Sequence, residues 1–256
     1  SIQFDLAVDA INLDRYRPKP ADTEGGPQTT SVAPPPLAVA LIPVQTLRDL
    51  SIEGIFKVQS LMAMGLSGKE VSVKLLAKNG VLKSEQGIKE FYNGRYVGKT
   101  VVDARQNTPK IIVTEQVSNI NIEPLLIDLL GESPIAGVAN ITADLTTHGN
   151  TVPAFKSALN GTAEFSFNDG AVTGVDVGVL MKQAQAILNG DNIADAFVNG
   201  IGKTPFSKAS GTAQINDGII NNQDLIVITP LVNVAGVGSA NLVNEQIDYQ
   251  LTLQRS

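Results

Sequence analysis

The stretch Asn244–Gln254, N-E-Q-I-D-Y-Q-L-T-L-Q, decides the fold class because apolar and polar residues alternate along it. The apolar positions are Ile247, Tyr249, Leu251 and Leu253. Successive side chains of a β-strand point to opposite faces of the sheet, so this alternation predicts a strand with one apolar face and one polar face. The function of the protein then depends on what covers the apolar face.

The same alternation recurs along much of the chain, and short turns interrupt it. Ile141 and Leu145 belong to one alternating segment, and Phe165 and Phe167 belong to another. Hairpins are predicted where glycine follows Asn or Asp, because these pairs readily adopt the positive φ of a tight turn. Three such pairs separate predicted strands: Asn79-Gly80, Asp169-Gly170 and Asp217-Gly218.

Helical patterns are fewer and shorter than the strand patterns. Four segments have helical spacing or helix-capping residues: Pro43–Leu50, Asn121–Gly131, Pro153–Leu159 and Val175–Asn189. Helices of this number and length do not cover so many one-sided strands. The sequence therefore predicts a mainly β fold with a few short helices, in which a long curved antiparallel sheet forms a β-groove and the helices cap one face or one end.

The distribution of Pro, Gly, Ser and Thr predicts the domain organisation. Residues 17–37 are rich in these four types and predict a linker or a disordered loop. Residues 1–16 begin inside an alternating pattern and predict a strand of a preceding region, whereas residues 38–256 predict one β-rich domain. We therefore interpret the chain as a piece of a longer protein, in which any membrane anchor lies upstream. No apolar run in the sequence reaches membrane-spanning length.

The composition restricts the classes of partner. The 256 residues are 43% hydrophobic, which is enough for a sizeable core. A formal net charge of −6 does not favour binding to a phosphate backbone, so nucleic acid is not expected as a partner. Cysteine is absent, which excludes disulfides, thiol catalysis and cysteine-based zinc sites.

Two stretches imitate a phosphate-binding loop without meeting its requirements. Gly94–Thr100 ends in Gly-Lys-Thr, but three residues separate its glycines where the motif needs four. It also runs into a predicted strand, whereas phosphate binding uses the amides at a helix N-terminus. In the second stretch, Gly202-Lys203-Thr204, Phe197 stands where the leading glycine is needed. We interpret each stretch as a turn of a hairpin.

The residue types that carry catalysis or bind metals are not arranged in a functional pattern. His148 is the single histidine and is predicted to lie in an exposed turn, so a second histidine for a metal site or a relay is lacking. Asp169 and Asp217 are explained by the Asp-Gly turns in which they are predicted to lie, and Asp248 by its place on the polar face of a strand, so none of them needs a catalytic role. A carboxylate pair at glycosidase spacing stays open as an alternative. We predict a protein that is not an enzyme and binds no cofactor or metal.

A series of motifs in a fixed order carries a family resemblance. In the second half of the chain the motifs are Leu145–Thr151, Leu159–Ala163, Asn168–Asp176, Gly211–Ala213, Ile215–Gly218, Asn222–Leu225, Gly236–Gly238 and Ile247–Leu251. Tyr92–Gly98 and Phe4–Leu6 add to the series upstream. Each motif is ordinary for strands and turns, but their order and spacing together resemble the AsmA family over nearly the whole chain. Gln250 departs from the family pattern, in which Arg or Lys is common.

The resemblance implies a location and a general role. AsmA proteins are Gram-negative envelope proteins that are anchored in the inner membrane by an upstream helix and extend into the periplasm. Members are linked to outer-membrane biogenesis, and larger relatives to phospholipid movement between the two membranes along a β-groove. The implied partners are the membrane, through an anchor outside this chain, and envelope proteins. The resemblance supplies no catalytic positions.

An apolar face that no helix covers suits the acyl chain of a phospholipid. A sixteen-carbon chain costs on the order of 12 kcal/mol to place in water, at about 0.8 kcal/mol per CH₂, and an apolar lining offsets much of this cost. We predict that the lining includes Ile141, Leu145, Phe165, Phe167, Ile247, Tyr249, Leu251 and Leu253. The helix predicted within residues 175–189 would then act as a lid or end cap. The alternatives are a sealed core and a scaffold that docks through a sheet edge.

Overall fold

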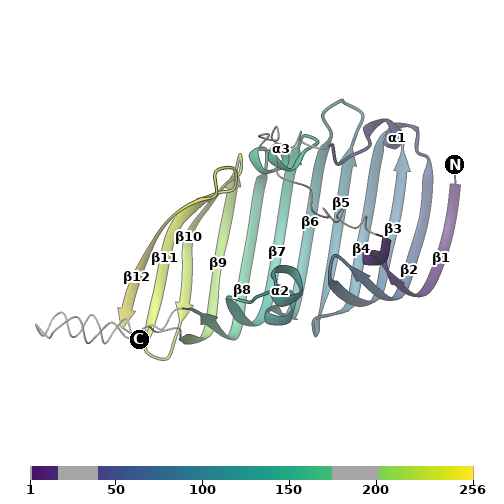
Figure 1. The fold of residues 1–256 in the computed structure, drawn as a ribbon. Coiled ribbons are helices and arrows are strands. Elements are labelled where there is room, and N and C mark those ends of the chain that lie inside the picture. The colour runs from purple at the N-terminus through teal and green to yellow at the C-terminus, as the bar shows by residue number, and fades with distance from the viewer. Residues whose placement is uncertain (1, 17–39, 175–201, 256) are drawn as a thin grey trace, which may run out of the picture.

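The computed structural model describes residues 2–16, 40–174 and 202–255, which form one open sheet (Figure 1). Within these residues, twelve strands lie side by side in chain order from β1 to β12. Neighbouring strands are antiparallel except β1 and β2, which are parallel. The predicted mainly β fold with a long antiparallel sheet is confirmed.

The short helices stand at the ends of the strands, with α1 and α3 at one end and α2 at the other (Figure 1). The strands are β1 (Ile2–Asn12), β2 (Ile52–Ala63), β3 (Leu66–Lys78), β4 (Val81–Phe91), β5 (Gly94–Asp103), β6 (Lys110–Asn121), β7 (Ile135–His148), β8 (Asn160–Thr173), β9 (Lys203–Asn216), β10 (Ile219–Ile228), β11 (Val232–Asn241) and β12 (Gln246–Arg255). The helices are the 3-10 helix η1 (Leu13–Tyr16) and the α-helices α1 (Val44–Asp49), α2 (Ile122–Leu130) and α3 (Val152–Ser157).

The strand predicted within residues 1–16 is β1, and η1 follows it directly. Parallel neighbours need a crossover connection, and the long segment between β1 and β2 provides one. The carboxylate of Asp14 in η1 accepts hydrogen bonds from the amides of Met64 and Gly65, at 2.6 and 2.9 Å. The end of β1 is therefore fixed to the turn that joins β2 and β3.

Two of the three predicted glycine hairpins are present as expected. Asn79-Gly80 joins β3 to β4, and Asp217-Gly218 joins β9 to β10, with positive φ at all four residues. The hairpin predicted at Asp169-Gly170 is wrong, because β8 continues through it. These two residues lie opposite Gly137 alone in β7, since the register shifts there, and the extra residue forms a β-bulge. The positive φ of 50° at Asp169 thus bends a strand instead of reversing it.

The predicted helices within the described residues are confirmed as α1, α2 and α3. At its C-terminal end α2 is followed by Gly131, which has a φ of 83° and donates its amide hydrogen bond to the Ile127 carbonyl. The helix predicted at 175–189 and the linker predicted at 17–37 lie outside the described residues.

Among the described residues, the larger of two clusters of buried hydrophobic side chains lies at the α2 end of the sheet, and Val232 and Val234 form the smaller one. Phe91, Ile120, Ile122 and Ala139 are buried together. The partly buried side chains that pack against them include Leu125 and Leu126 of α2 and Ile141 and Phe167 of the sheet. One short helix therefore seals one part of one sheet face.

Candidate functional site

The pairing register places the predicted lining residues of β7 and β8 on one face of the sheet. Phe165 lies opposite Ile141 on one side and Gly211 on the other. Phe167 lies two residues after Phe165 in β8, and Leu145 lies four residues after Ile141 in β7. Because side chains alternate along a strand, these residues share one face, which we call the apolar face.

The predicted residues of β12 belong to the same face. Leu251 lies opposite Gly236 of β11, and both Leu251 and Leu225 of β10 lie over this glycine. The ring of Phe165 lies over Gly211 in the same way. The alternation of β12 adds the other three predicted positions, Ile247, Tyr249 and Leu253, to the face. One face of the sheet thus carries all eight candidates, although their role in lipid binding stays a prediction.

The apolar face is not sealed. Its central side chains, including those of Ile141, Leu145 and Phe165, are half-buried. Exposure rises towards the two edge strands, where Leu251 is 60% exposed, Ile247 77% and Ile2 65%. Among the described residues no second sheet covers this face. Buried side chains under α2, at Val58 and Val71, and at Val232 and Val234 seal parts of the face, but no sealed core runs along all of it.

Helix α2 closes one end of the face. It starts directly after β6, and its Asp128 accepts a hydrogen bond from the Tyr92 hydroxyl at 2.5 Å. The backbone carbonyl of Asp128 also lies against Gly65 in the β2–β3 turn. Since α2 begins at β6 and reaches this turn, it lies across the ends of the strands between them.

The segment that contains α1 fixes the opposite end. Asn150, after β7, exchanges hydrogen bonds with the backbone of Leu41 and Ile42. Seven residues after Leu41, Arg48 near the end of α1 donates a hydrogen bond to the Ala104 carbonyl after β5, at 2.9 Å. The segment thus connects the end of β7 with the end of β5. Between β3 and β7 helices therefore lie at both strand ends, and the apolar face is open along its middle.

A polar cluster interrupts the apolar face in its centre. Its members are Ser84, Gln86, Tyr96, Thr100 and Glu115. The amide nitrogen of Gln86 donates to the hydroxyls of Ser84 and Thr100, at 2.8 and 3.1 Å. Burial raises the pKa of the Glu115 carboxyl above its ordinary value. Burial, with the Glu115 carboxylate as a further cause, also raises the pKa of the Tyr96 phenol.

Sequence reasoning missed this cluster. The signal was present for Glu115, because Val113, Glu115 and Val117 alternate with Thr114 and Gln116 and so place a carboxylate among apolar neighbours. For Gln86 and Tyr96 the face assignment depends on the cross-strand pairing, which the sequence does not display.

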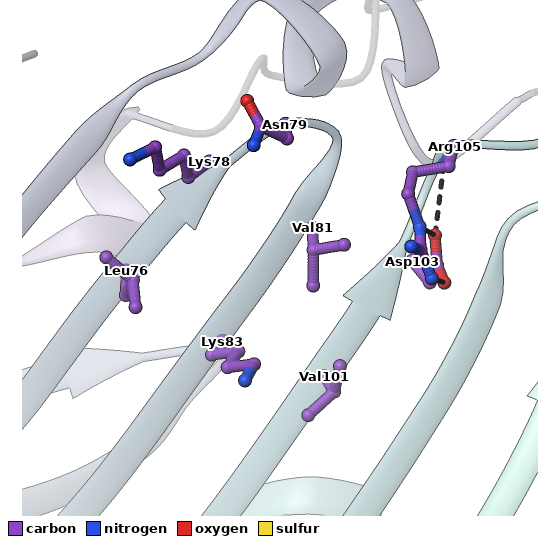
Figure 2. Close-up of a pocket in the computed structure, with 8 residues that line it drawn as sticks. All are labelled: Leu76, Lys78, Asn79, Val81, Lys83, Val101, Asp103 and Arg105. Atoms are coloured by element: carbon purple, nitrogen blue, oxygen red, sulfur yellow. Dashed lines mark hydrogen bonds and ion pairs between the residues drawn. The ribbon is translucent and has the colours of Figure 1, made fainter.

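The opposite, polar face carries shallow cavities and charged side chains. One cavity of about 530 Å³ lies over β3, β4 and β5, as Figure 2 shows. Its lining includes Leu76, Lys83 and Val101, which are cross-strand neighbours. Beside them the Arg105 guanidinium pairs with Asp103 at 2.5 Å and lowers the pKa of this carboxyl to about 2. These contacts hold the loop after β5 against the end of that strand.

The remaining sequence predictions also have a place in the structure. His148 is exposed at the end of β7. The turn predicted at Gly94–Thr100 is wrong in position, because these residues lie within strand β5 and the turn before them is Tyr92-Asn93, with positive φ at both residues. Lys203 begins β9, so the second stretch also leads into a strand. Across the described ranges, no group of three or more acidic, His or Cys side chains is placed to hold a metal ion. In the same ranges, no helix has the length and apolar character needed to cross a membrane.

Comparison with known proteins shows the family to which this chain belongs. The family model for the AsmA family matches residues 1–225, which is most of the chain. This chain belongs to the AsmA family. It is 21% identical to Protein AsmA of Escherichia coli K12 over 98% of its own length, and it spans 42% of the length of that relative. No solved structure matches the chain.

Proposed function

We propose that this part of the protein binds phospholipid acyl chains on its apolar face and acts, without catalysis, in biogenesis of the outer membrane. The observation that carries the proposal is the apolar face itself, which runs from β1 to β12 and is open along its middle, with helices at both strand ends between β3 and β7. Family membership supports an envelope role. A periplasmic location and an inner-membrane anchor outside this chain belong to the same proposal.

The energetics favour an apolar guest. Leaving one Leu, Ile or Val side chain in water instead of burying it costs about 1.5–3 kcal/mol. The exposed large hydrophobic residues on the edge strands include Ile2, Leu6, Ile247 and Leu251. An acyl chain that lies on this face removes water from both surfaces, while the headgroup stays in solvent.

The size of the face also fits an acyl chain. Twelve strands spaced about 4.8 Å apart span about 50 Å across the sheet. A chain that lies from strand to strand on either side of the polar cluster therefore finds apolar side chains along its length, and more than one lipid fits.

The unpaired edges favour a second candidate, a scaffold for envelope proteins. Strands β1 and β12 each pair on one side only within the described sheet. Unpaired backbone groups on such an edge accept a strand from a partner. Edge pairing needs no lipid, so a lipid-retention experiment separates the two functions.

Native mass spectrometry of the purified chain after exposure to phospholipid vesicles tests the lipid proposal. We expect wild-type protein to retain phospholipid. Leu251→Asp should reduce retention about tenfold or more, because it replaces an apolar contact worth about 1.5–3 kcal/mol with a charge. Leu251 is 60% exposed, so the variant should fold.

Thr252→Asp is the matched control, since it adds the same charge one residue further along β12, on the polar face. This variant should retain lipid as the wild type does. Absence of retained lipid in the wild type, or equal retention by both variants, would refute lipid binding on the apolar face.

A further inference from the structure

One part of the polar face carries an excess of positive charge, although the chain has a formal net charge of −6. It consists of three adjacent cross-strand rows of β3 to β6 and the loop residue Arg105, and we call it the basic patch. Glu53 of β2 lies at one border and Asp144 of β7 at the other, so the positive charge is local. The patch has six basic side chains, Lys74, Lys78, Lys83, Lys99, Arg105 and Lys110, against the two carboxylates Glu85 and Asp103.

The cavity of about 530 Å³ over β3, β4 and β5 lies within this patch (Figure 2). Leu76, Val81 and Val101 give the cavity an apolar floor. Lys83 lies between Leu76 and Val101 in the cross-strand register, and Lys78 lies two residues after Leu76 on β3. A cavity of this volume suits a small ligand better than the flat surface of a protein.

Two cations of the cavity lining are not neutralised by the protein. The Arg105 guanidinium is occupied, because its Nε and Nη2 atoms both donate to the Asp103 carboxylate. Lys78 and Lys83, in contrast, form no ion pair with a carboxylate of the described residues. The cavity therefore offers two ammonium groups to an anion.

The rim of the cavity at the strand ends is held in place. The carbonyl of Gly80, in the β3–β4 turn, accepts a hydrogen bond from the Ala104 amide at 2.8 Å. Arg48 of α1 donates to the carbonyls of Ala104 and Arg105, at 2.9 and 3.3 Å. The side chain of Asn79, in the same turn, also lines the cavity. A fixed rim lowers the entropy cost of ordering a ligand there.

We propose that this cavity binds a phosphate monoester that carries an apolar chain. Such a phosphate has about two negative charges at neutral pH, which match the ammonium groups of Lys78 and Lys83. The attached chain lies over Leu76 and Val101 and reaches Ile112, which is opposite Val101 in β6 and is 43% exposed. The inference does not depend on the proposed function, because the cavity is on the opposite face of the sheet.

Isothermal titration calorimetry with soluble short-chain probes tests the site. The probes are dihexanoyl phosphatidic acid, dihexanoyl phosphatidylcholine and inorganic phosphate. Wild-type protein should bind the phosphatidic acid about tenfold or more tightly than either other probe, because two exposed charge pairs together contribute roughly that factor. The double variant Lys78→Gln, Lys83→Gln should lose this preference and bind phosphatidylcholine as the wild type does.

Lys208→Gln is the matched control, since it removes the charge of an exposed lysine of β9 outside the basic patch. It should keep the wild-type affinities. Chemical acetylation of lysines followed by peptide mass spectrometry locates the site. Phosphatidic acid should protect Lys78 and Lys83 from acetylation and leave Lys208 reactive.

The other outcomes would overturn the proposal in different ways. Equal affinity for inorganic phosphate would exclude a role of the apolar floor, and equal affinity for phosphatidylcholine would exclude a role of the lysines. Phosphatidic acid that binds without protecting Lys78 and Lys83 would refute the cavity site and leave lipid binding on the apolar face intact. Tighter binding of a hexaglutamate peptide would assign the patch to an acidic protein instead.

Discussion

At Glu115 a carboxyl group stands between Val113 and Val117 on the apolar face. Burial disfavours its charged form and raises its pKa, while the Tyr96 hydroxyl opposes this effect. A carboxyl whose pKa is higher in the folded than in the unfolded protein lowers stability once the pH rises above the unfolded value. The residue thus reduces stability at neutral pH.

Glu115→Gln should therefore raise the free energy of unfolding at pH 8. The gain should shrink as the pH falls and vanish at about pH 3, well below the ordinary value of 4.5, because Glu115 is then protonated in both the folded and the unfolded protein. Urea unfolding at the two pH values measures the difference. Glu164→Gln, on the polar face, should show no comparable change with pH, and an equal effect of both variants would contradict a specific role of burial at Glu115.

At the scale of elements, the hairpins decide which strands become neighbours. Gly218 has a φ of 75° in the β9–β10 turn. Its amide donates to the Leu159 carbonyl, and its own carbonyl accepts from Leu242, so the turn also fixes the chain after α3 and the β11–β12 turn. A change at this glycine therefore affects three connections.

Gly218→Ala should lower the free energy of unfolding by about 1–3 kcal/mol, because the turn holds residue 218 in a left-handed backbone conformation that alanine disfavours. The Cβ would also lie 2.3 Å from the Lys156 carbonyl oxygen. Urea denaturation measures the loss. Gly87→Ala, in the interior of β4, has no atom within 4 Å of the new Cβ and should be neutral or raise stability by about 0.5–1 kcal/mol. Similar losses in both variants would exclude the backbone explanation.

The elements also show where local sequence signals are sufficient. Asn79-Gly80 and Asp217-Gly218 form the predicted hairpins, because in each case the chain has a partner strand directly after the turn. Asp169-Gly170 has the same local chemistry but forms a bulge, because β8 is paired on both sides by β7 and β9 beyond that point. Pairing with distant residues overrode the local preference.

At the scale of the whole molecule, stability should be uneven across the sheet. Ile120 and Ala139 are fully buried under α2, whereas the side chains of β12 are exposed and one edge of that strand is unpaired. Regions with few buried contacts open at a small free energy.

Hydrogen exchange followed by mass spectrometry should therefore show the slowest exchange in β6 and β7 and the fastest strand exchange in β12. Binding of phospholipid should slow exchange along the apolar strands and change the Asp217-Gly218 turn little. Equal protection of β7 and β12 in the lipid-free protein would show that the sheet unfolds only as a unit.

The sequence by itself determined the class of fold, because the period of two in segments such as Asn244–Gln254 depends only on neighbouring residues. The same pattern determined which residues share a face within each strand, including Leu251 on β12. It also determined the two tight hairpins, since their backbone conformation is set by Asn, Asp and Gly locally.

Only the tertiary structure decided how these strands combine. The order of the strands and their register bring Gln86 and Tyr96 beside Glu115, although 29 positions separate Gln86 from Glu115 in the chain. The tertiary structure also decided that α2 seals one part of the apolar face and leaves the rest open. The physical reason is that cross-strand pairing and burial depend on contacts between distant residues, which no local pattern encodes.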